Sequence, residues 1–228
     1  MKKRTKKCVI LLSGGLDSSV VLSICNQLKY EIYAISFNYK QRHAKELDLA
    51  KWQAKKNNVK SYKIFNIDLY GGSALTDDIK VPENKDVTSI PKTIPVTYVA
   101  GRNLVFLSIA AGYAESLDIN DIYIGVNSVD YSGYPDCRKE FIVSFEKIIN
   151  KFTKKGLEGR SFRIKTPLIH LSKREIILIG EKNSVDFSKT SSCYNPKNLK
   201  SCGLCDSCLL RKKGFEEAKI KDPLVYDV

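Results

Sequence analysis

The sequence predicts a doubly wound α/β fold, with helices on both faces of a parallel sheet. Short apolar runs alternate with segments of helical spacing through the first two thirds of the chain, as in successive βαβ units. The length of 228 residues suits one good core with a small annex. After residue 189, Cys, Gly and Pro replace the periodic pattern. We therefore expect an α/β domain over residues 1–188 and a second region over 189–228.

The expected strands are short runs rich in apolar, β-branched and aromatic residues. In chain order they cover residues 8–12, 30–37, 61–67, 121–126 and 163–165. The first is apolar throughout, which is typical of a parallel strand buried on both faces.

The expected helices have apolar residues three and four positions apart. In chain order they cover residues 20–25, 43–57, 103–117, 140–152 and 172–182. Ser172 is the expected N-cap of the last one, and Glu175 completes a capping box. Residues 69–99 lack periodicity and are interrupted by Gly and Pro, so we expect a lid, a binding loop or a disordered segment there.

Composition is that of an ordinary globular protein, with 43% hydrophobic and 28% charged residues. No apolar stretch approaches the length of a membrane span, so no membrane partner is expected. The basic first seven residues resemble the start of a signal peptide, but residues 13–15 interrupt the apolar run that should follow. We therefore expect a cytoplasmic protein.

The net charge of +13 would suit a nucleic-acid partner. The excess is mostly lysine scattered in pairs, without a recognition module, and also fits a biased base composition of the genome. We therefore expect no direct nucleic-acid partner. The charge can instead attract nucleotide phosphates and a carboxylate substrate.

Residues 13–19, Ser-Gly-Gly-Leu-Asp-Ser-Ser, carry the most information in the chain. They join the first strand to the first helix, where free N–H groups and the helix dipole favour an anion. Gly14 and Gly15 allow backbone to approach a phosphate closely, and the serine hydroxyls add donors. Asp17 suits this site if a magnesium ion lies between it and the phosphate. The alternative is an ordinary Ser/Gly turn into a helix.

Four cysteines near the C-terminus have the spacing C-x8-C-x2-C-x2-C; they are Cys193, Cys202, Cys205 and Cys208. Four thiolates complete a tetrahedral structural zinc site and leave no open position for catalysis. An iron–sulfur cluster is the alternative. Cys8 and Cys25 fall on apolar elements, and we expect them in the core.

Polar clusters follow three other expected elements, over residues 37–43, 99–103 and 130–138. The carboxyl ends of parallel strands are where such sheets bind ligands. Arg102, together with a helix N-terminus, can meet a phosphate or carboxylate, although Asn103 can also be a simple N-cap. The last cluster combines tyrosines, carboxylates and an arginine, which suits a guanine-like ring. Polar or tyrosine-rich turns are the alternative for these segments.

Four segments together resemble the 7-cyano-7-deazaguanine synthase family, the queuosine branch of the PP-loop ATP pyrophosphatase superfamily. They are the Ser-Gly-Gly-Leu-Asp-Ser loop, Phe-Asn-Tyr-Lys-Gln-Arg-His at 37–43, Ser-Gly-Tyr-Pro-Asp-Cys-Arg at 132–138, and the cysteine segment from 192 to 211. The resemblance spans nearly the whole chain. Lys40, Ala100 and Ser191 depart from the family's usual Gly, Pro and Trp, but none is a cysteine ligand or an expected catalytic group.

The resemblance implies an adenine nucleotide α-hydrolase-like, Rossmann-like fold with a C-terminal zinc-binding helical region. It implies an ATP-dependent ligase that converts 7-carboxy-7-deazaguanine and ammonia into the 7-cyano base for queuosine in tRNA. The acid and then the amide are adenylated, and pyrophosphate and AMP leave each time. The expected ligands are structural Zn²⁺ and ATP with Mg²⁺ as substrate. Members of the family form homodimers, so the resemblance also implies a homodimer for this chain.

The resemblance also implies site residues by matching motifs. Ser13, Asp17 and Arg102 are the expected catalytic groups, with Asp17 orienting magnesium on the leaving pyrophosphate. The expected ATP-binding residues are Leu12, Ser13, Gly14, Gly15, Leu16, Asp17, Ser18, Ser19, Val20, Val21 and Leu22. The expected substrate-binding residues are Gln41, Arg42, His43, Tyr134, Asp136 and Arg138.

Two other functions fit parts of the sequence. A PP-loop enzyme that modifies tRNA directly, a thiolase or a lysine ligase, would suit the basic charge. A zinc-ribbon nucleic-acid-binding module would explain the cysteines but would leave the Ser-Gly-Gly-Leu-Asp-Ser loop without a role.

Overall fold

A computed structural model of the protein describes residues 5–41, 45–68, 71–91, 93–127, 133–197 and 200–227. Its centre is a five-stranded parallel sheet with the strand order β3-β2-β1-β4-β5. The strands are β1 (Lys7–Leu11), β2 (Glu31–Asn38), β3 (Ser61–Asn66), β4 (Asp121–Tyr123) and β5 (Arg163–Lys165). The predicted parallel α/β fold is therefore confirmed.

Strand β1 lies in the middle because its side chains are apolar on both faces. Cys8, Val9 and Ile10 are completely buried. The strand pairs with β2 on one side, where Val9 faces Tyr33, and with β4 on the other, where Val9 faces Ile122. The chain thus runs outward through β2 and β3 and then returns to β4 beside β1. The crevice beyond the carboxyl ends of β1 and β4 is where such a sheet binds ligands.

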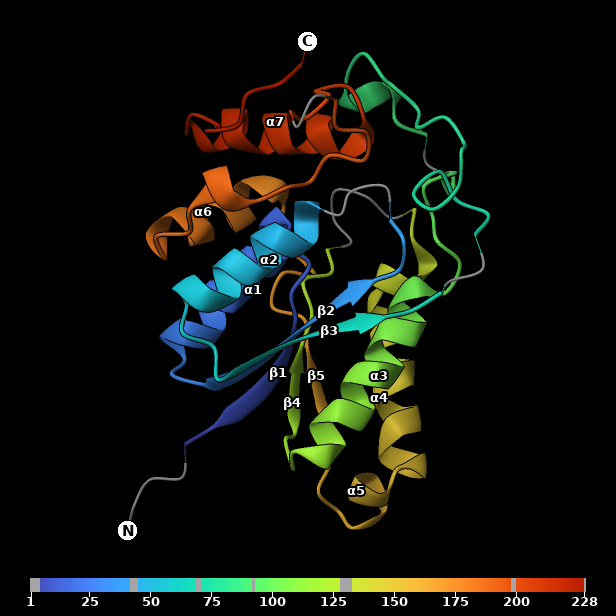
Figure 1. Ribbon diagram of the computed structural model, residues 1–228, viewed down its shortest axis with the longest axis vertical. Coiled ribbons are helices and arrows are strands. Elements are labelled where there is room, and N and C mark those ends of the chain that lie inside the picture. The colour runs from blue at the N-terminus through green and yellow to red at the C-terminus, as the bar shows by residue number, and fades with distance from the viewer. Residues whose placement is uncertain are drawn as a thin grey trace.

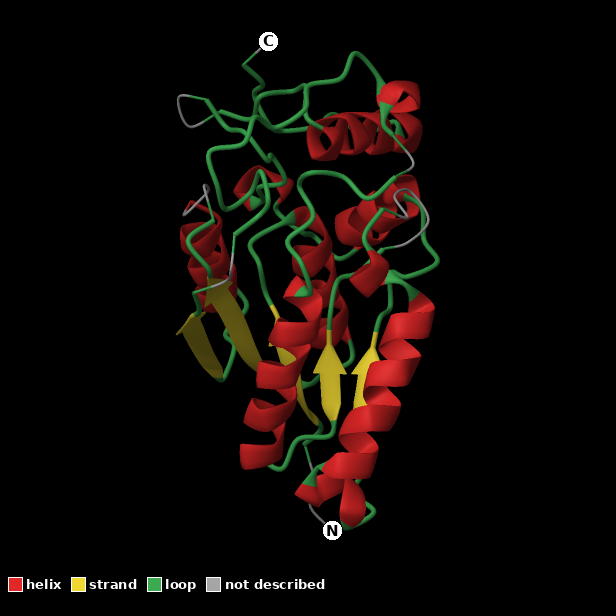
Figure 2. Ribbon diagram, turned by 90° about the vertical axis from the view of Figure 1, so that its right-hand side faces the viewer, coloured by secondary structure: helices red, strands yellow, loops and turns green. Residues whose placement is uncertain are grey.

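Helices cover both faces of the sheet (Figures 1 and 2). On one face lie α1 (Leu16–Gln27), α2 (Lys45–Lys56) and α6 (Lys173–Lys182), whose apolar residues share one core cluster. On the other face lie α3 (Arg102–Ser116) and α4 (Lys139–Phe152), which share a second cluster, followed by the short α5 (Lys154–Leu157). Cys8 and Cys25 are buried in the first cluster, as predicted.

A cap of irregular chain and one helix covers the carboxyl end of the sheet. It consists of the described residues of 71–99, with the 3₁₀ turn η1 (Val87–Ser89), and of 190–227, with α7 (Asp206–Ala218). Figure 1 shows the first segment beside α7. Asn84 joins them, since its N–H donates to the Leu204 carbonyl (2.9 Å) and its side-chain amide donates to Asp206 (2.6 Å). The two further short 3₁₀ turns are η2 (Pro135–Cys137) and η3 (Phe187–Lys189).

The predicted elements lie close to the observed ones, and the Ser172–Glu175 capping box of α6 is present. Two differences have physical reasons. Strand β4 ends at Tyr123 instead of residue 126, because Gly125 packs against the backbone of Asp17. A Cβ added to Gly125 would lie 3.1 Å from the Asp17 carbonyl carbon. Helix α5 is a single turn capped by the Thr153 side chain, too short for a periodic signal. In the described part of the chain, every helix is too short or too polar to traverse a bilayer.

Candidate active site

A pocket of about 310 Å³ opens at the carboxyl end of the sheet. The glycine loop after β1, the ends of β2 and β4, and the N-termini of α2, α3 and α6 contribute to its wall. Leu11, Ile35, Phe37 and Phe106 provide an apolar side, and the Phe37 and Phe106 rings stack with centroids 3.9 Å apart. The pocket thus joins a flat apolar wall to a polar loop, which suits a nucleotide.

The glycine loop is held tightly against α2. Gly14 has φ +83°, and a Cβ there would lie only 2.2 Å from the Glu46 carbonyl oxygen. Gly15 caps α1 without a side-chain hydrogen bond, so the first-turn N–H groups remain available to an anion. The hydroxyls of Ser18 and Ser19 both donate to the Gly15 carbonyl, at 3.1 and 2.7 Å. This geometry supports the predicted anion site.

Asp17 pairs with a lysine that the sequence analysis did not select. Both carboxylate oxygens of Asp17 accept from Lys173 Nζ, at 2.7 and 2.9 Å. Lys173 is the first residue of α6, directly after the predicted N-cap Ser172. Helix α6 follows β5, so it begins at the carboxyl edge of the sheet, where the site lies. The Ser172–Glu175 capping box marks this helix start in the sequence and could therefore have pointed to Lys173.

Glu46 is a second acidic group that the sequence analysis missed. It lies half-buried in the first turn of α2 and lines the pocket. Burial raises the pKa of its carboxyl to about 8, although the nearby Arg102 guanidinium opposes this shift. Arg102 begins α3 and lines the same pocket. A carboxyl that titrates near neutral pH and a fixed cation therefore share one cavity.

Tyr134 links the pocket to the cap. Its hydroxyl lies 2.8 Å from the Thr97 hydroxyl and donates to the Tyr194 hydroxyl at 3.4 Å. Burial raises the pKa of both tyrosines, so both phenols stay protonated near neutral pH. Both phenols are therefore neutral, and their oxygens can accept hydrogen bonds from a ligand.

Asp136 lies outside the lining of the pocket. It is buried, and its Oδ2 accepts the Asn103 N–H (2.9 Å) at the N-terminus of α3. The Asn103 side-chain amide donates to the Asp136 carbonyl (3.3 Å) and to Cys137 Sγ (3.2 Å). The alternative that Asn103 is the N-cap is wrong, because Gly101, at φ +60°, occupies that position.

The predicted site residues divide into three groups. Those that line the pocket are Leu12, Ser13, Gly15, Leu16, Asp17, Ser18, Gln41, Arg102 and Tyr134. Among the residues that the structure describes, the ones outside the lining are Gly14, Ser19, Val20, Val21, Leu22, Asp136 and the exposed Arg138. Arg42 and His43 lie outside the described residues. The ligand-binding roles of all these residues stay predictions.

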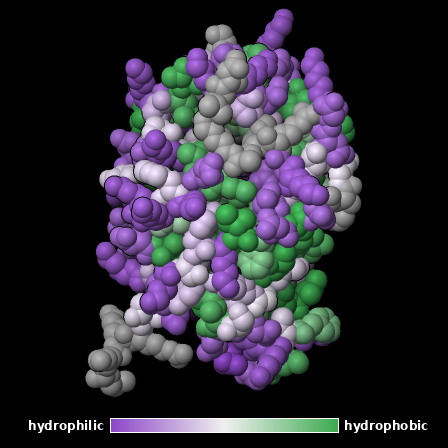
Figure 3. All heavy atoms as spheres, viewed as in Figure 1, coloured by the Kyte–Doolittle hydropathy of each residue, from purple (hydrophilic) through white to green (hydrophobic). Residues whose placement is uncertain are grey.

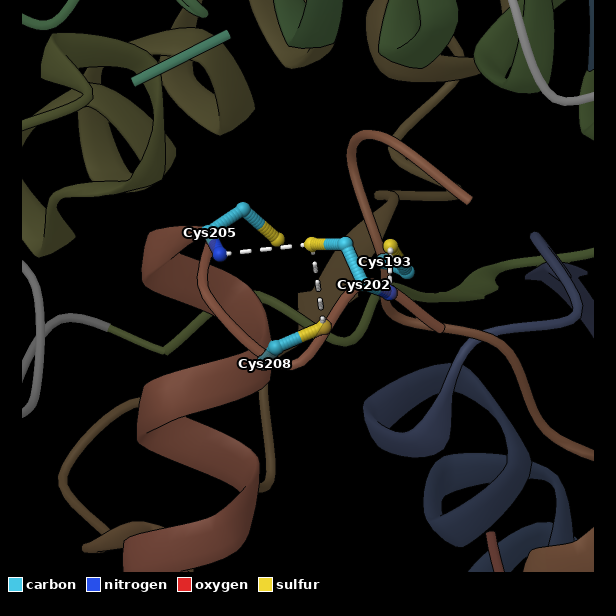
Figure 4. Close-up of side chains that lie close together, drawn as sticks. All are labelled: Cys193, Cys202, Cys205 and Cys208. Carbon is cyan, nitrogen blue, oxygen red and sulfur yellow. Dashed lines mark hydrogen bonds between the residues drawn. The ribbon is translucent and has the colours of Figure 1, made fainter. Parts of the chain in front are cut away.

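The cysteine cluster lies in the cap next to the pocket. The Sγ atoms of Cys193, Cys202, Cys205 and Cys208 all lie within 4.8 Å of one another and are buried (Figure 4). Backbone N–H groups donate to three of the sulfurs, including Tyr194 N to Cys205 Sγ at 3.4 Å. Four converging thiols without another ligand type fit a zinc ion. Tyr194 connects this cluster directly to the pocket.

Comparisons with known proteins agree with the motifs. The sequence model of the family described as "Queuosine biosynthesis protein QueC" matches residues 7–219. A 7-cyano-7-deazaguanine synthase from Saccharophagus degradans is 52% identical over 225 residues, covering 97% of this chain and 98% of the relative. One from Citrifermentans bemidjiense is 52% identical over 224 residues, with the same coverage of both chains.

Among solved structures, the NMN synthetase from Francisella tularensis has a TM-score of 0.49 and 15% identity, covering 96% of this chain and 74% of that chain. The family assignment depends on the sequence matches instead, which extend over nearly the full length of the chain and its relatives. The chain belongs to the queuosine biosynthesis protein QueC family.

Proposed function

We propose that the pocket at the carboxyl end of the sheet is where this chain performs the ATP-dependent synthesis of 7-cyano-7-deazaguanine for queuosine biosynthesis. The family match and the relatives of that name support the activity. The observation that carries the assignment to this pocket is the glycine loop, because it brings the N-terminus of α1, which has no side-chain cap, to the pocket.

The reaction needs activation because a carboxylate is a poor electrophile. We propose that the acid oxygen of the 7-carboxy base attacks the α-phosphate of ATP and pyrophosphate leaves. Ammonia then displaces AMP and forms the amide. A second ATP activates the amide oxygen, and loss of AMP and the nitrogen-bound protons leaves the nitrile.

The glycine loop and the N-terminus of α1 would hold the departing pyrophosphate through backbone N–H groups. Asp17 would bind the Mg²⁺ that accompanies ATP, and Lys173 would neutralise phosphate charge when the carboxylate turns to the metal. Arg102 would neutralise the charge that develops during adenylation.

The deazaguanine ring would bind near Tyr134, whose hydroxyl is fixed by Thr97 and Tyr194. Gln41 is the second described substrate candidate, although its amide also bonds to the Tyr39 N–H and the Phe37 carbonyl. Asp136 would act indirectly, by fixing the start of α3 beside Arg102.

The cysteine cluster would hold a structural zinc. Four thiolates leave no position for substrate, so the ion would organise the cap and supply no catalytic group. Its contribution would be folding free energy, since metal binding joins chain segments that contain few apolar residues.

A homodimer is supported by apolar side chains on one side of the molecule. Figure 3 shows hydrophobic residues gathered over α3 and α4. Several are exposed there, including Leu104 (46%), Ile148 (53%) and Phe152 (72%). Exposed apolar patches are typical of association surfaces. We also place the protein in the cytoplasm, where ATP is available and free thiols persist.

The deciding experiment combines purified protein, ATP, ammonium and the free 7-carboxy base, with pyrophosphate and product mass as readouts. We expect pyrophosphate release without tRNA and a product with the mass of the 7-cyano base. Release that requires tRNA would favour a tRNA-modifying PP-loop enzyme. Absence of ATP turnover would contradict the proposal.

A further inference from the structure

Formation of the amide needs a proton acceptor in addition to an activated acid. Near neutral pH most ammonia is present as ammonium, which has no lone pair for attack. One proton must leave ammonium before attack, and another leaves the nitrogen as the tetrahedral intermediate expels AMP. A group at the adenylate carbonyl that accepts a proton would therefore accelerate this step.

Only two carboxyl groups line the pocket among the residues that the structure describes, and they differ in their partners. Asp17 is bound through both oxygens to Lys173 Nζ. Glu46 forms no ion pair within the described part of the chain. It is therefore the carboxyl available to a substrate nitrogen.

The other titratable groups of the pocket are poor proton acceptors near neutral pH. Burial raises the pKa of Tyr39, and it raises that of the Cys137 thiol to about 11. Tyr134 and Tyr194 are likewise protonated. Lys173, Arg102 and Arg211 supply positive charge and have no acceptor in their charged forms.

Glu46 is also fixed relative to the glycine loop. A Cβ on Gly14 would meet the Glu46 carbonyl and would lie 3.0 Å from Ala50 N, so the backbone of the first two turns of α2 packs tightly against the loop. Glu46 therefore enters the pocket beside the loop that would hold the departing pyrophosphate.

We propose, on the basis of the function proposed above, that Glu46 is the general base for the nitrogen nucleophile in amide formation. The Glu46 carboxylate accepts a proton from ammonium. The nitrogen lone pair then forms the C–N bond, and the acyl C–O bond breaks with its electron pair leaving on AMP. The second nitrogen proton passes to solvent water as AMP leaves, and Glu46 releases its own proton to solvent before the next cycle.

The charges around Glu46 agree with this role. The groups that act on Glu46 electrostatically are Arg102 on α3, Tyr39 at the end of β2 and Cys193 in the cap, and Asp17 and Lys173 line the same pocket. The raised pKa of Glu46, about 8, is close to the operating pH, where a base both accepts and releases protons readily.

The test compares ammonium with hydroxylamine in Glu46→Gln. Hydroxylamine is largely uncharged at pH 7.5 and attacks without prior deprotonation, giving a hydroxamate. We expect the ammonium-dependent rate to fall about 100-fold, the usual scale for loss of a general base. The hydroxylamine-dependent rate and the acid-dependent ATP–pyrophosphate exchange should change less than about fivefold.

Asp48→Asn is the matched control, because Asp48 also lies in the first turn of α2 but is exposed. It should keep both rates. If Glu46→Gln does not fold, Glu46→Asp replaces it, because this variant keeps the charge but shortens the side chain. Its ammonium-dependent rate is compared with its hydroxylamine-dependent rate in the same way. Equal loss with both nucleophiles, or an unchanged ammonium rate, would overturn the assignment. Failure of the wild-type protein to release pyrophosphate with the 7-carboxy base would instead contradict the proposed function.

Discussion

The α/β core and the cap contribute to the same pocket, but different forces hold them in place. In the core, β1 is fixed by parallel pairing on both sides and by completely buried side chains such as Val9 and Ile10. In the cap, the apolar cluster consists of the four cysteines with Ala74 and Val81. Polar contacts such as Asn84 with Asp206 complete it.

The proposed function assigns ATP binding to the core side of the pocket and recognition of the base to the cap side. The groups expected to hold ATP come from the rigid core, whereas Tyr194 and Thr97, which contact Tyr134, come from the cap. Loss of the metal should therefore impair the base-binding side before the nucleotide side. Four experiments test this separation.

The largest effect on activity is expected for Asp17→Ala in the core. Loss of the carboxylate would remove the proposed magnesium ligand where charge develops, so pyrophosphate release should fall at least about 100-fold. The fold should persist, because Asp17 lies at the pocket and its partner Lys173 can reach solvent. Pyrophosphate release and circular dichroism measure the two outcomes. Asp68→Asn, an exposed carboxylate paired with Lys40, is the control. Normal turnover of Asp17→Ala would remove Asp17 from the mechanism.

The largest effect on stability is expected for Cys205→Ser in the cap. It removes one of four thiolates, so zinc content should fall and the cap should lose several kcal/mol of stabilisation. Zinc analysis and hydrogen exchange provide the measurement, with protection lost over 190–227 but retained in β1. The buried Cys25 offers a control as Cys25→Ala, which should keep the metal. Simultaneous loss of protection in β1 and the cap would contradict the separation.

The sequence predicted the core far better than the cap, for a physical reason. Strands and helices that bury one face leave a periodic pattern, and the Ser172–Glu175 capping box marks the start of α6. Ala74 and Val81 carry no such pattern, because they pack against cysteines more than 100 positions later in the chain. Helix α7 was predicted only as part of a helical region.

The candidate site was predictable where chemistry follows local sequence. The glycine loop and the cysteines each form a short motif whose members stay together in the fold. Lys173 and Glu46 enter the pocket from the first turns of α6 and α2. These helix starts lie beside the glycine loop because of the order of the strands in the sheet, which no local sequence motif reveals. Asp136 was predicted from its motif to bind the substrate, and in the structure its carboxylate accepts the backbone N–H of Asn103 at the start of α3.

Substitutions at two glycines allow a direct comparison of packing in the core and in the cap. Gly14 in the core and Gly72 in the cap both have positive φ, +83° and +79°. A Cβ on Gly14 would meet the Glu46 carbonyl at 2.2 Å, whereas nothing lies within 4 Å of one on Gly72. We expect Gly14→Ala to cost about 3 kcal/mol or more and Gly72→Ala about 1 kcal/mol, the latter from backbone strain alone. Urea unfolding checks both values, and equal losses would mean that the loop and α2 are not in close contact.

The smallest effect is expected where the two regions meet, at Tyr134→Phe. The substitution keeps the ring and removes the hydroxyl that contacts Thr97 and Tyr194. One lost hydrogen bond costs about 1 kcal/mol, so the KM for the 7-carboxy base should rise about fivefold. The kcat and the KM for ATP should stay near their original values, which steady-state kinetics can separate.

Tyr226→Phe is the control for this last prediction, because its hydroxyl bonds to Asp222 within the cap, outside the lining of the pocket. It should lower stability by a similar amount without changing the KM for the base. A rise in the KM for ATP with Tyr134→Phe would place nucleotide against the cap. Nucleotide binding would then depend on cap and core together, and metal loss would weaken both substrates at once.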